Sequence, residues 1–216
     1  KMKHEIKVIT LYILFSLLFF SCTTKNNKDI ITSKIDNLLE SEIDSMGPGG
    51  SILLKKGKDI IYMKSYGLAN LETKEKITEH TSFNTGSISK TFVSNGILIL
   101  EERGQLSLED SLSMYFNDFN NKEIANKVKI KHLLSHTSGL IDNRNVNDNV
   151  EFYLTAKDSA NFAPLKLADS LEFLPGERFK YSNPAFNGLA LIIEKITNDK
   201  WQKFIIQNIL KPSNMK

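Results

Sequence analysis

The chain of 216 residues is long enough for one sizeable domain or two small ones. Hydrophobic residues make up 41% and charged residues 25% of it, a balance that is typical of a globular protein and excludes a wholly disordered one. The formal net charge is +3 and falls to +1 without residues 1–21, which carry three lysines and one glutamate, so nothing indicates a nucleic-acid partner.

Residues 1–21 are expected to be a signal peptide and not part of the fold. Lys1, Lys3 and Lys7 precede an uncharged run, VITLYILFSLLFF, at residues 8–20. This run is too short to span a bilayer comfortably but has the length of the apolar core of a secretory signal.

Cys22, the only cysteine, follows a small residue at the end of this run, in FFSC. The junction resembles a bacterial lipoprotein signal, although Phe19 stands where that signal usually has leucine. The resemblance implies an exported protein of the periplasm or cell envelope, anchored to a membrane by a lipid on Cys22. An ordinary signal peptide with an incidental cysteine is the alternative. One cysteine excludes an intramolecular disulfide framework.

A polar tether at residues 22–30 is expected to join the anchor to a domain at residues 31–216. The domain begins with a predicted helix that ends before Gly47-Pro48. Four apolar residues share one face of this helix: Ile35, Leu38, Leu39 and Ile43. Two apolar runs then flank Lys56-Gly57-Lys58, a pattern that predicts a β-hairpin.

The stretch NTGSISKTF, residues 84–92, comes directly before a second predicted helix, which Gly104 would end. Its apolar residues have helical spacing: Val93, Ile97, Leu98 and Leu100. Ser87 is expected at the start of this helix, where free N–H groups and the helix dipole favour an anion, with Lys90 one turn further on the same face. A lysine beside a serine can activate it as a nucleophile. A capping serine and a solvated lysine are the alternative.

A second element, Tyr181-Ser182-Asn183, follows a Pro-Gly turn and precedes an apolar helical run. Neither motif is specific alone, because S-x-x-K recurs at residues 213–216 and Tyr-x-Asn recurs at residues 115–117. Only the copy at residues 181–183 has both the turn before it and the helix after it.

Three motifs in order, GSISKTF, LLSHTSGL at residues 133–140 and PGERFKYSN, resemble the serine β-lactamase and penicillin-binding protein superfamily. The resemblance covers about residues 31–216 and lies closest to the branch of class C β-lactamases, D-aminopeptidases and carboxylesterases. It implies a β-lactamase/transpeptidase-like α/β (α+β) fold, in which helices flank an antiparallel sheet. It also implies a largely helical region between Ser87 and Tyr181.

The resemblance makes Ser87 the acylated nucleophile and Lys90 its activating partner, as in other S-x-x-K enzymes. Tyr181 would share general acid–base catalysis with Lys90. Asn183 would bind the substrate amide and Lys90. The oxyanion would be bound by the Ser87 N–H and by a donor from a later strand, each contributing about 3 to 4 kcal/mol.

The family also carries a third motif, Lys-Thr-Gly or His-x-Gly, on a strand well beyond the tyrosine motif. This sequence begins at Lys1 and ends in ILKPSNMK, where the family typically has Pro-Leu-Gly-Met. We therefore expect a fragment or a truncated product that holds only the N-terminal part of the fold and is inactive by itself.

The expected function is a serine hydrolase that cleaves a β-lactam, a D-alanyl peptide or an ester through an acyl-enzyme, without cofactor or metal. Its expected partners are a small-molecule or peptidoglycan-like substrate and the anchoring membrane. The alternative is a noncatalytic envelope lipoprotein that uses the same pocket for binding or sensing. The substrate cannot be read from residues that lack the third motif.

Other candidate sites are less well supported. His132 and His136, four residues apart, could lie on one helix face and bind zinc, but HLLSH lacks the glutamate of H-E-x-x-H, which favours a structural role. The G-x-S-x-G motif of Ser-His-Asp hydrolases is absent. A further amphipathic pattern predicts core residues: Trp201, Phe204, Ile205 and Ile209.

Overall fold

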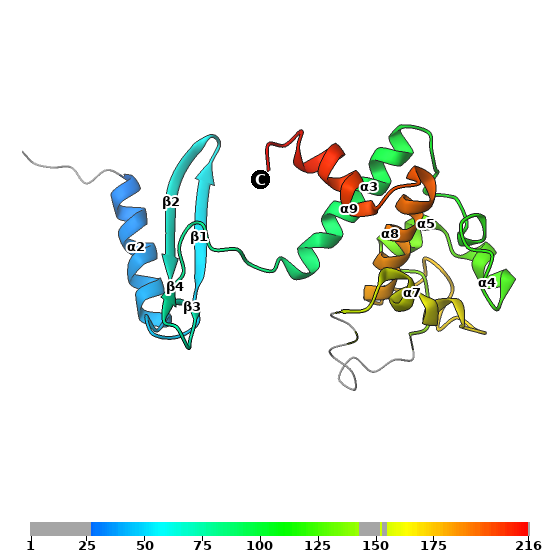
Figure 1. The fold of residues 1–216 in the computed structure, drawn as a ribbon, viewed down its shortest axis with the longest axis horizontal. Coiled ribbons are helices and arrows are strands. Elements are labelled where there is room, and N and C mark those ends of the chain that lie inside the picture. Colours follow the sequence, from blue (N-terminus) through cyan, green and yellow to red (C-terminus); the bar gives the residue numbers. More distant parts are fainter. Residues whose placement is uncertain (1–26, 143–151, 153–154, 216) are drawn as a thin grey trace, which may run out of the picture. The chain divides into compact units, whose positions relative to one another are not determined.

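One helix and two small antiparallel sheets precede a region that is almost entirely helical (Figure 1). The computed structural model describes residues 27–142, 152 and 155–215. The chain divides into two units after Asn84. The expected signal peptide and Cys22 lie outside the described residues. In the described part of the chain, no helix has the length and apolarity needed to cross a membrane.

The first unit confirms the predicted hairpin. Its two strands pair antiparallel, with Gly50 opposite Tyr66, and Gly57 makes the turn with a φ of 61°, a backbone conformation that glycine adopts without strain. A shorter pair of strands follows. The strand bounds are β1 (Gly50–Lys56), β2 (Asp59–Tyr66), β3 (Leu68–Asn70) and β4 (Glu75–Lys76).

Helix α2 (Asn27–Glu42) lies alongside the hairpin and begins within the segment expected to be a tether (Figure 1). Asp36 joins the helix to β2, because its carboxylate accepts hydrogen bonds from the hydroxyl of Tyr62 at 2.6 Å and from the ammonium of Lys64 at 3.0 Å. Leu38, expected on the apolar face, is 63% exposed. The helix is therefore held by polar contacts as well as by its apolar residues.

The second unit confirms the expected helical region between Ser87 and Tyr181. Its helices and turns are η1 (Gly86–Ile88), α3 (Ser89–Glu102), η2 (Leu112–Met114), α4 (Lys122–Lys127), α5 (Ile130–Leu134), α7 (Asp158–Lys166), α8 (Asn183–Thr197), α9 (Trp201–Ile205) and the π-helical turn η4 (Ile206–Leu210).

Helices α3, α8 and α9 share the hydrophobic core. Fully buried members include Ile97 of α3 and Ile193 of α8, each of which contributes about 1.5 to 3 kcal/mol through burial. Gly96 lets these helices approach closely, since a Cβ atom there would lie 2.8 Å from Ile205 Cδ1 and 2.9 Å from Ile193 Cδ1. Leu98 was expected on the same apolar face, but it is 45% exposed because the apolar stripe continues through Leu100 instead.

Candidate active site

Ser87 lies in the 3-10 turn η1, just before α3 begins at Ser89. The predicted helix start is thus confirmed to within one turn, and α3 ends at Glu102, with Gly104 two residues beyond it at a φ of 66°. The side chain of Ser87 does not cap the helix. Its hydroxyl is instead free to face the side chains of the other two motif residues.

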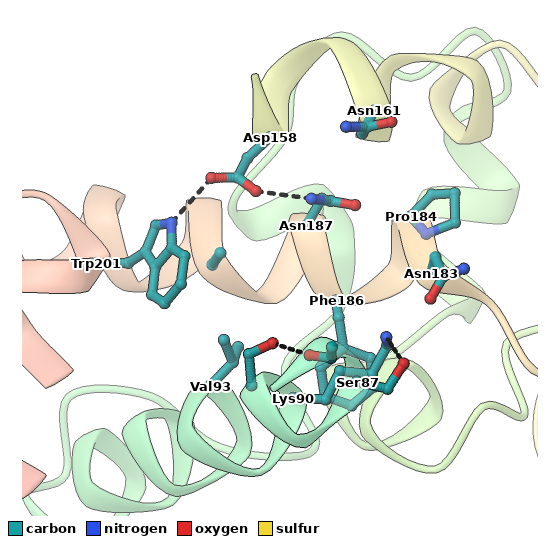
Figure 2. A pocket seen from close by; sticks show the side chains of 13 residues that line it. Ser87, Lys90, Val93, Asp158, Asn161, Asn183, Pro184, Phe186, Asn187 and Trp201 are labelled. Atoms are coloured by element: carbon teal, nitrogen blue, oxygen red, sulfur yellow. Dashed lines mark hydrogen bonds between the residues drawn. The ribbon is translucent and has the colours of Figure 1, made fainter. Parts of the chain in front are cut away.

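Three predicted site residues meet at the Ser87 hydroxyl. The Lys90 ammonium donates a hydrogen bond to Ser87 Oγ at 3.1 Å (Figure 2). The Tyr181 hydroxyl lies 2.8 Å from the same oxygen, although 94 positions separate the two residues in sequence. Both groups are within the reach that proton transfer requires.

The charge of Lys90 also acts on the tyrosine. Burial alone would raise the pKa of the Tyr181 phenol, but hydrogen bonds with Lys90 and Ser87 and the positive charge of Lys90 outweigh it and lower the pKa below its ordinary value. The ammonium of Lys90 lies 5.0 Å from the centroid of the Tyr181 ring and 5.8 Å from that of Phe186. The site therefore favours the phenolate of Tyr181 more than water does.

Ser87 and Lys90 line a cavity with a volume of about 390 Å³. Asn183, the first residue of α8, lines the same cavity. Its amide makes no hydrogen bond to Lys90 among the contacts of the described residues, so that expected contact stays a prediction. Ser182 starts α8 by accepting a hydrogen bond from the N–H of Ala185 at 3.3 Å. The cap places Asn183 at the cavity edge.

The far wall of the cavity comes from residues that sequence reasoning missed. Asp158 of α7 accepts hydrogen bonds from Asn187 of α8 at 2.7 Å and from the indole N–H of Trp201 at 2.8 Å (Figure 2). No short motif joins these three residues, so no local signal could have found them. They tie α7, α8 and α9 together around the cavity.

Comparison with known proteins identifies the family of this chain. The family described as Beta-lactamase matches residues 35–216. The chain belongs to the β-lactamase family. Its relatives include Protein flp of Staphylococcus aureus, 32% identical over 84% of this chain, and Penicillin-binding protein 4* of Bacillus subtilis, 32% identical over 77% of it. A solved structure, the octameric penicillin-binding protein homologue from Pyrococcus abyssi, aligns with a TM-score of 0.72 and 28% identity over 85% of this chain.

The relatives are much longer than this β-lactamase-family chain. The matches cover 37% of Protein flp, 36% of Penicillin-binding protein 4* and 43% of the Pyrococcus abyssi chain. These comparisons show the β-lactamase/transpeptidase-like fold, of which the described residues hold part.

The duplicate motifs lie elsewhere in this family member. Tyr115 of the second Tyr-x-Asn copy is half-buried and donates a hydrogen bond to Asp110 at 2.6 Å. Burial and this hydrogen bond raise the pKa of the Tyr115 phenol, the opposite of the shift at Tyr181. Ser213 lies in a turn after η4, and Lys216 is outside the described residues.

The middle signature of the family, residues 133–140, holds the segment that carries the tyrosine motif. The carbonyl oxygen of Gly139 accepts a hydrogen bond from the N–H of Glu172 at 2.9 Å, and that of Thr137 accepts one from Gly176 at 2.8 Å. Gly139 has a φ of 67°, and a Cβ atom there would lie 2.1 Å from the carbonyl oxygen of Phe173. Only glycine allows the two backbones to approach this closely.

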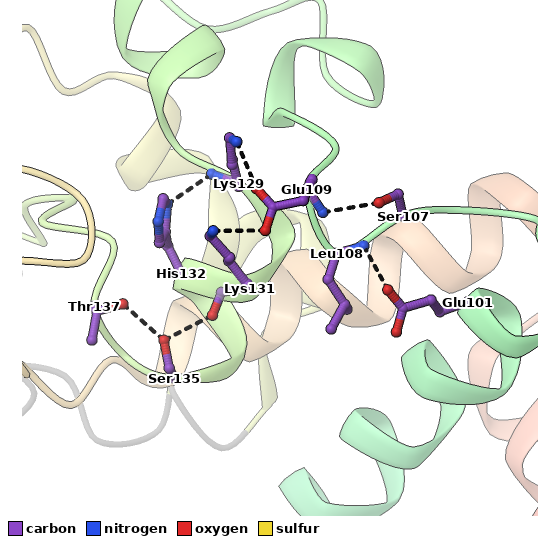
Figure 3. Close-up of polar contacts among 9 residues, drawn as sticks. All are labelled: Glu101, Ser107, Leu108, Glu109, Lys129, Lys131, His132, Ser135 and Thr137. Carbon is purple, nitrogen blue, oxygen red and sulfur yellow. Dashed lines mark hydrogen bonds and ion pairs between the residues drawn. The ribbon is translucent and has the colours of Figure 1, made fainter.

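The two histidines do not share a helix face, because α5 ends at Leu134 and His136 has a φ of 56°. His132 is buried in α5, where its Nδ1 accepts a hydrogen bond from the N–H of Lys129 at 3.0 Å (Figure 3). Glu109 holds the start of this helix by pairing with Lys129 and Lys131, each at 2.6 Å (Figure 3). His132 thus makes a structural hydrogen bond at the start of α5.

Proposed function

We propose that the whole protein is a serine hydrolase that cleaves an amide or ester through an acyl-enzyme on Ser87. The observation that carries this proposal is the double contact of one exposed hydroxyl with Lys90 at 3.1 Å and Tyr181 at 2.8 Å. A serine whose only task is to start a helix has no need of two proton-carrying partners. Membership in the β-lactamase family supports the same chemistry.

In the proposed reaction, Ser87 Oγ attacks the carbonyl carbon of the substrate. Its proton passes to the Tyr181 phenolate, which the adjacent Lys90 ammonium stabilises. Tyr181 then gives the proton to the departing amine or alcohol as the carbon–leaving-group bond breaks. Water, deprotonated by the same pair, hydrolyses the acyl-enzyme and returns the hydroxyl of Ser87.

The proposed substrates are β-lactams, D-alanyl peptides or simple esters. One relative is named Penicillin-binding protein 4*, and one structural neighbour is a penicillin-binding protein homologue, so these names support a β-lactam as a ligand of this site. The cavity of about 390 Å³ has the size of a small-molecule site. In this proposal, the amide of Asn183 at the cavity edge binds the substrate amide.

A fluorophosphonate probe tests the proposal, because it reacts covalently with an activated serine. The whole protein should be labelled, and mass spectrometry of its peptides should place the adduct on Ser87. Absence of labelling at Ser87, with β-lactam or D-peptide binding retained, would instead favour the noncatalytic binding or sensing module.

We further propose that the protein is exported and anchored to a membrane of the cell envelope through a lipid on Cys22. The motivating observation is the FFSC junction after an apolar run. Radiolabelled palmitate fed to the producing cells should label the wild-type protein but not Cys22→Ser. Equal labelling of both would disprove this attachment site, whatever the outcome for Ser87.

A further inference from the structure

His136 of the middle signature holds the backbone on both sides of Tyr181. Its carbonyl oxygen accepts a hydrogen bond from the N–H of Lys180 at 2.8 Å. Its Nδ1 accepts a second from the N–H of Ser182 at 3.1 Å. Lys180 and Ser182, which flank the tyrosine, are therefore both hydrogen-bonded to His136, which lies 45 positions before Tyr181 in the chain.

The imidazole ring also contacts the phenol itself. Its centroid lies 4.5 Å from that of the Tyr181 ring, with 32° between the planes. Phe186 lies 5.0 Å and Phe179 5.7 Å from the same imidazole, so aromatic rings surround it. Contacts of this kind restrict the positions that the Tyr181 ring can take.

The backbone of His136 is held in an uncommon conformation. Its φ of 56° lies in the left-handed region, which is uncommon for residues other than glycine, although histidine, asparagine and aspartate adopt it more often than the rest. Such strain persists only where the surrounding structure over-determines it, often at a functional site. Here it lets the carbonyl oxygen and Nδ1 of one residue reach the same segment.

We propose that His136 is a positioning residue, which holds the Tyr181 hydroxyl within hydrogen-bond reach of Ser87 Oγ. The inference rests on the proposed function, since it assigns His136 a task in the acylation of Ser87. It gives the middle signature a role in the reaction, although His136 itself contacts neither Ser87 nor the substrate carbonyl in that scheme.

The hydrogen bond to Ser182 depends on the protonation of the imidazole. Nδ1 can accept an N–H only when His136 is neutral with its proton on Nε2. Burial, and then the positive charge of Lys90 on α3, lower the pKa of His136. The other charged or titratable groups of the tyrosine segment beside it are Tyr181 and Lys180, whose ammonium pairs with Glu172. Acidification through the pKa of His136 should therefore break this hydrogen bond.

Three variants separate positioning from stability. His136→Gly tolerates the positive φ and removes both the ring and Nδ1, whereas His136→Asn also tolerates it and offers Oδ1 near the place of Nδ1. His132→Ala is the matched control, because it removes a buried imidazole whose Nδ1 accepts a similar backbone hydrogen bond from Lys129 and whose ring lies near Gly176, five residues before Tyr181.

Fluorophosphonate labelling of the whole protein, corrected for folded fraction, should slow about 10²-fold in His136→Gly. It should recover largely in His136→Asn and stay near wild type in His132→Ala, even where that variant melts at lower temperature. Protonation of Tyr181 should slow labelling on acidification in both wild type and His136→Asn. Wild type should show a further fall that His136→Asn lacks, at a pH below about 6.5, because burial and Lys90 lower the pKa of His136 below this ordinary value. Wild-type labelling of His136→Gly would overturn the inference while leaving the proposed function intact.

A second measurement does not depend on activity. In protein labelled with 13C at tyrosine Cζ, the Tyr181 resonance, assigned through Tyr181→Phe, reports the phenol pKa. His136→Gly should raise this pKa toward the ordinary value of about 10, because Tyr181 leaves Lys90 and Ser87, whereas His132→Ala should not. If wild-type Ser87 is never acylated but this shift occurs, the proposed function fails and the positioning stands. An unchanged titration in His136→Gly would disprove the positioning.

Discussion

Replacing Ser87 with alanine should reduce fluorophosphonate labelling of the whole protein to background. The substitution removes the oxygen that would bond to the probe. In the described contacts, no other serine hydroxyl contacts both Lys90 and Tyr181. Gel fluorescence of the labelled protein measures this directly. Turnover of nitrocefin or p-nitrophenyl acetate, where wild type shows it, should disappear in the same variant.

Ser89→Ala is the matched control, two residues away in the same stretch. The hydroxyl of Ser89 donates to the carbonyl oxygen of Gly86 and takes no part in the contacts with Lys90 or Tyr181. Labelling should therefore stay close to wild type. If labelling is lost in Ser89→Ala and kept in Ser87→Ala, Ser87 is not the nucleophile, and the role assigned to Lys90 is wrong as well.

Lys90→Ala and Tyr181→Phe should each slow acylation by about 10²- to 10⁴-fold, because each removes one member of the pair that carries the proton and leaves the nucleophile in place. The single-turnover labelling rate is the measurement. The rate of wild type should rise with pH as the Tyr181 phenol ionises. In Lys90→Ala this rise should move to higher pH, since the hydrogen bond and charge that lower the Tyr181 pKa are gone.

Tyr115→Phe controls for the loss of a tyrosine hydroxyl. Its phenol belongs to the second Tyr-x-Asn copy and donates only to Asp110 in the described contacts. The variant should label at the wild-type rate, with some loss of stability from the broken hydrogen bond. Equal slowing in Tyr115→Phe and Tyr181→Phe would contradict the assignment of the proton carrier.

Local patterns in the sequence predicted the secondary structure that neighbouring residues determine, namely the hairpin and the helix after Ser87. The hairpin was predicted because a Lys-Gly-Lys turn separates two apolar runs, and Gly57 indeed has a positive φ. The helix after Ser87 was predicted from apolar spacing, and its i, i+3 geometry brings Lys90 to Ser87. The exposure of Leu98 was not predicted, because apolar spacing alone does not define the edges of the buried face of a helix.

The rest of the site depends on distances that no local pattern contains. The resemblance to a family brought Tyr181 together with Ser87, 94 positions apart. Nothing in the sequence indicated that Asp158 and Trp201 would meet across the cavity. The role proposed for the middle signature was also hidden, because all but one of its described hydrogen bonds to the tyrosine segment join main-chain groups, which every residue type carries, and the exception, at His136 Nδ1, spans 46 positions.

Gly96 has no side chain, yet it affects how closely the helices around the site can approach one another. It lies on α3, the helix that carries Lys90, where Ile193 of α8 and Ile205 fill the space that a methyl group would need. Because Tyr181 comes just before α8, the spacing of these two helices affects the distance between Tyr181 and Ser87, across which the proposed proton transfer would take place. A mutational scan would therefore flag Gly96 as intolerant even though it touches no reactant. Libraries built to change specificity should vary the cavity wall and keep this spacer fixed.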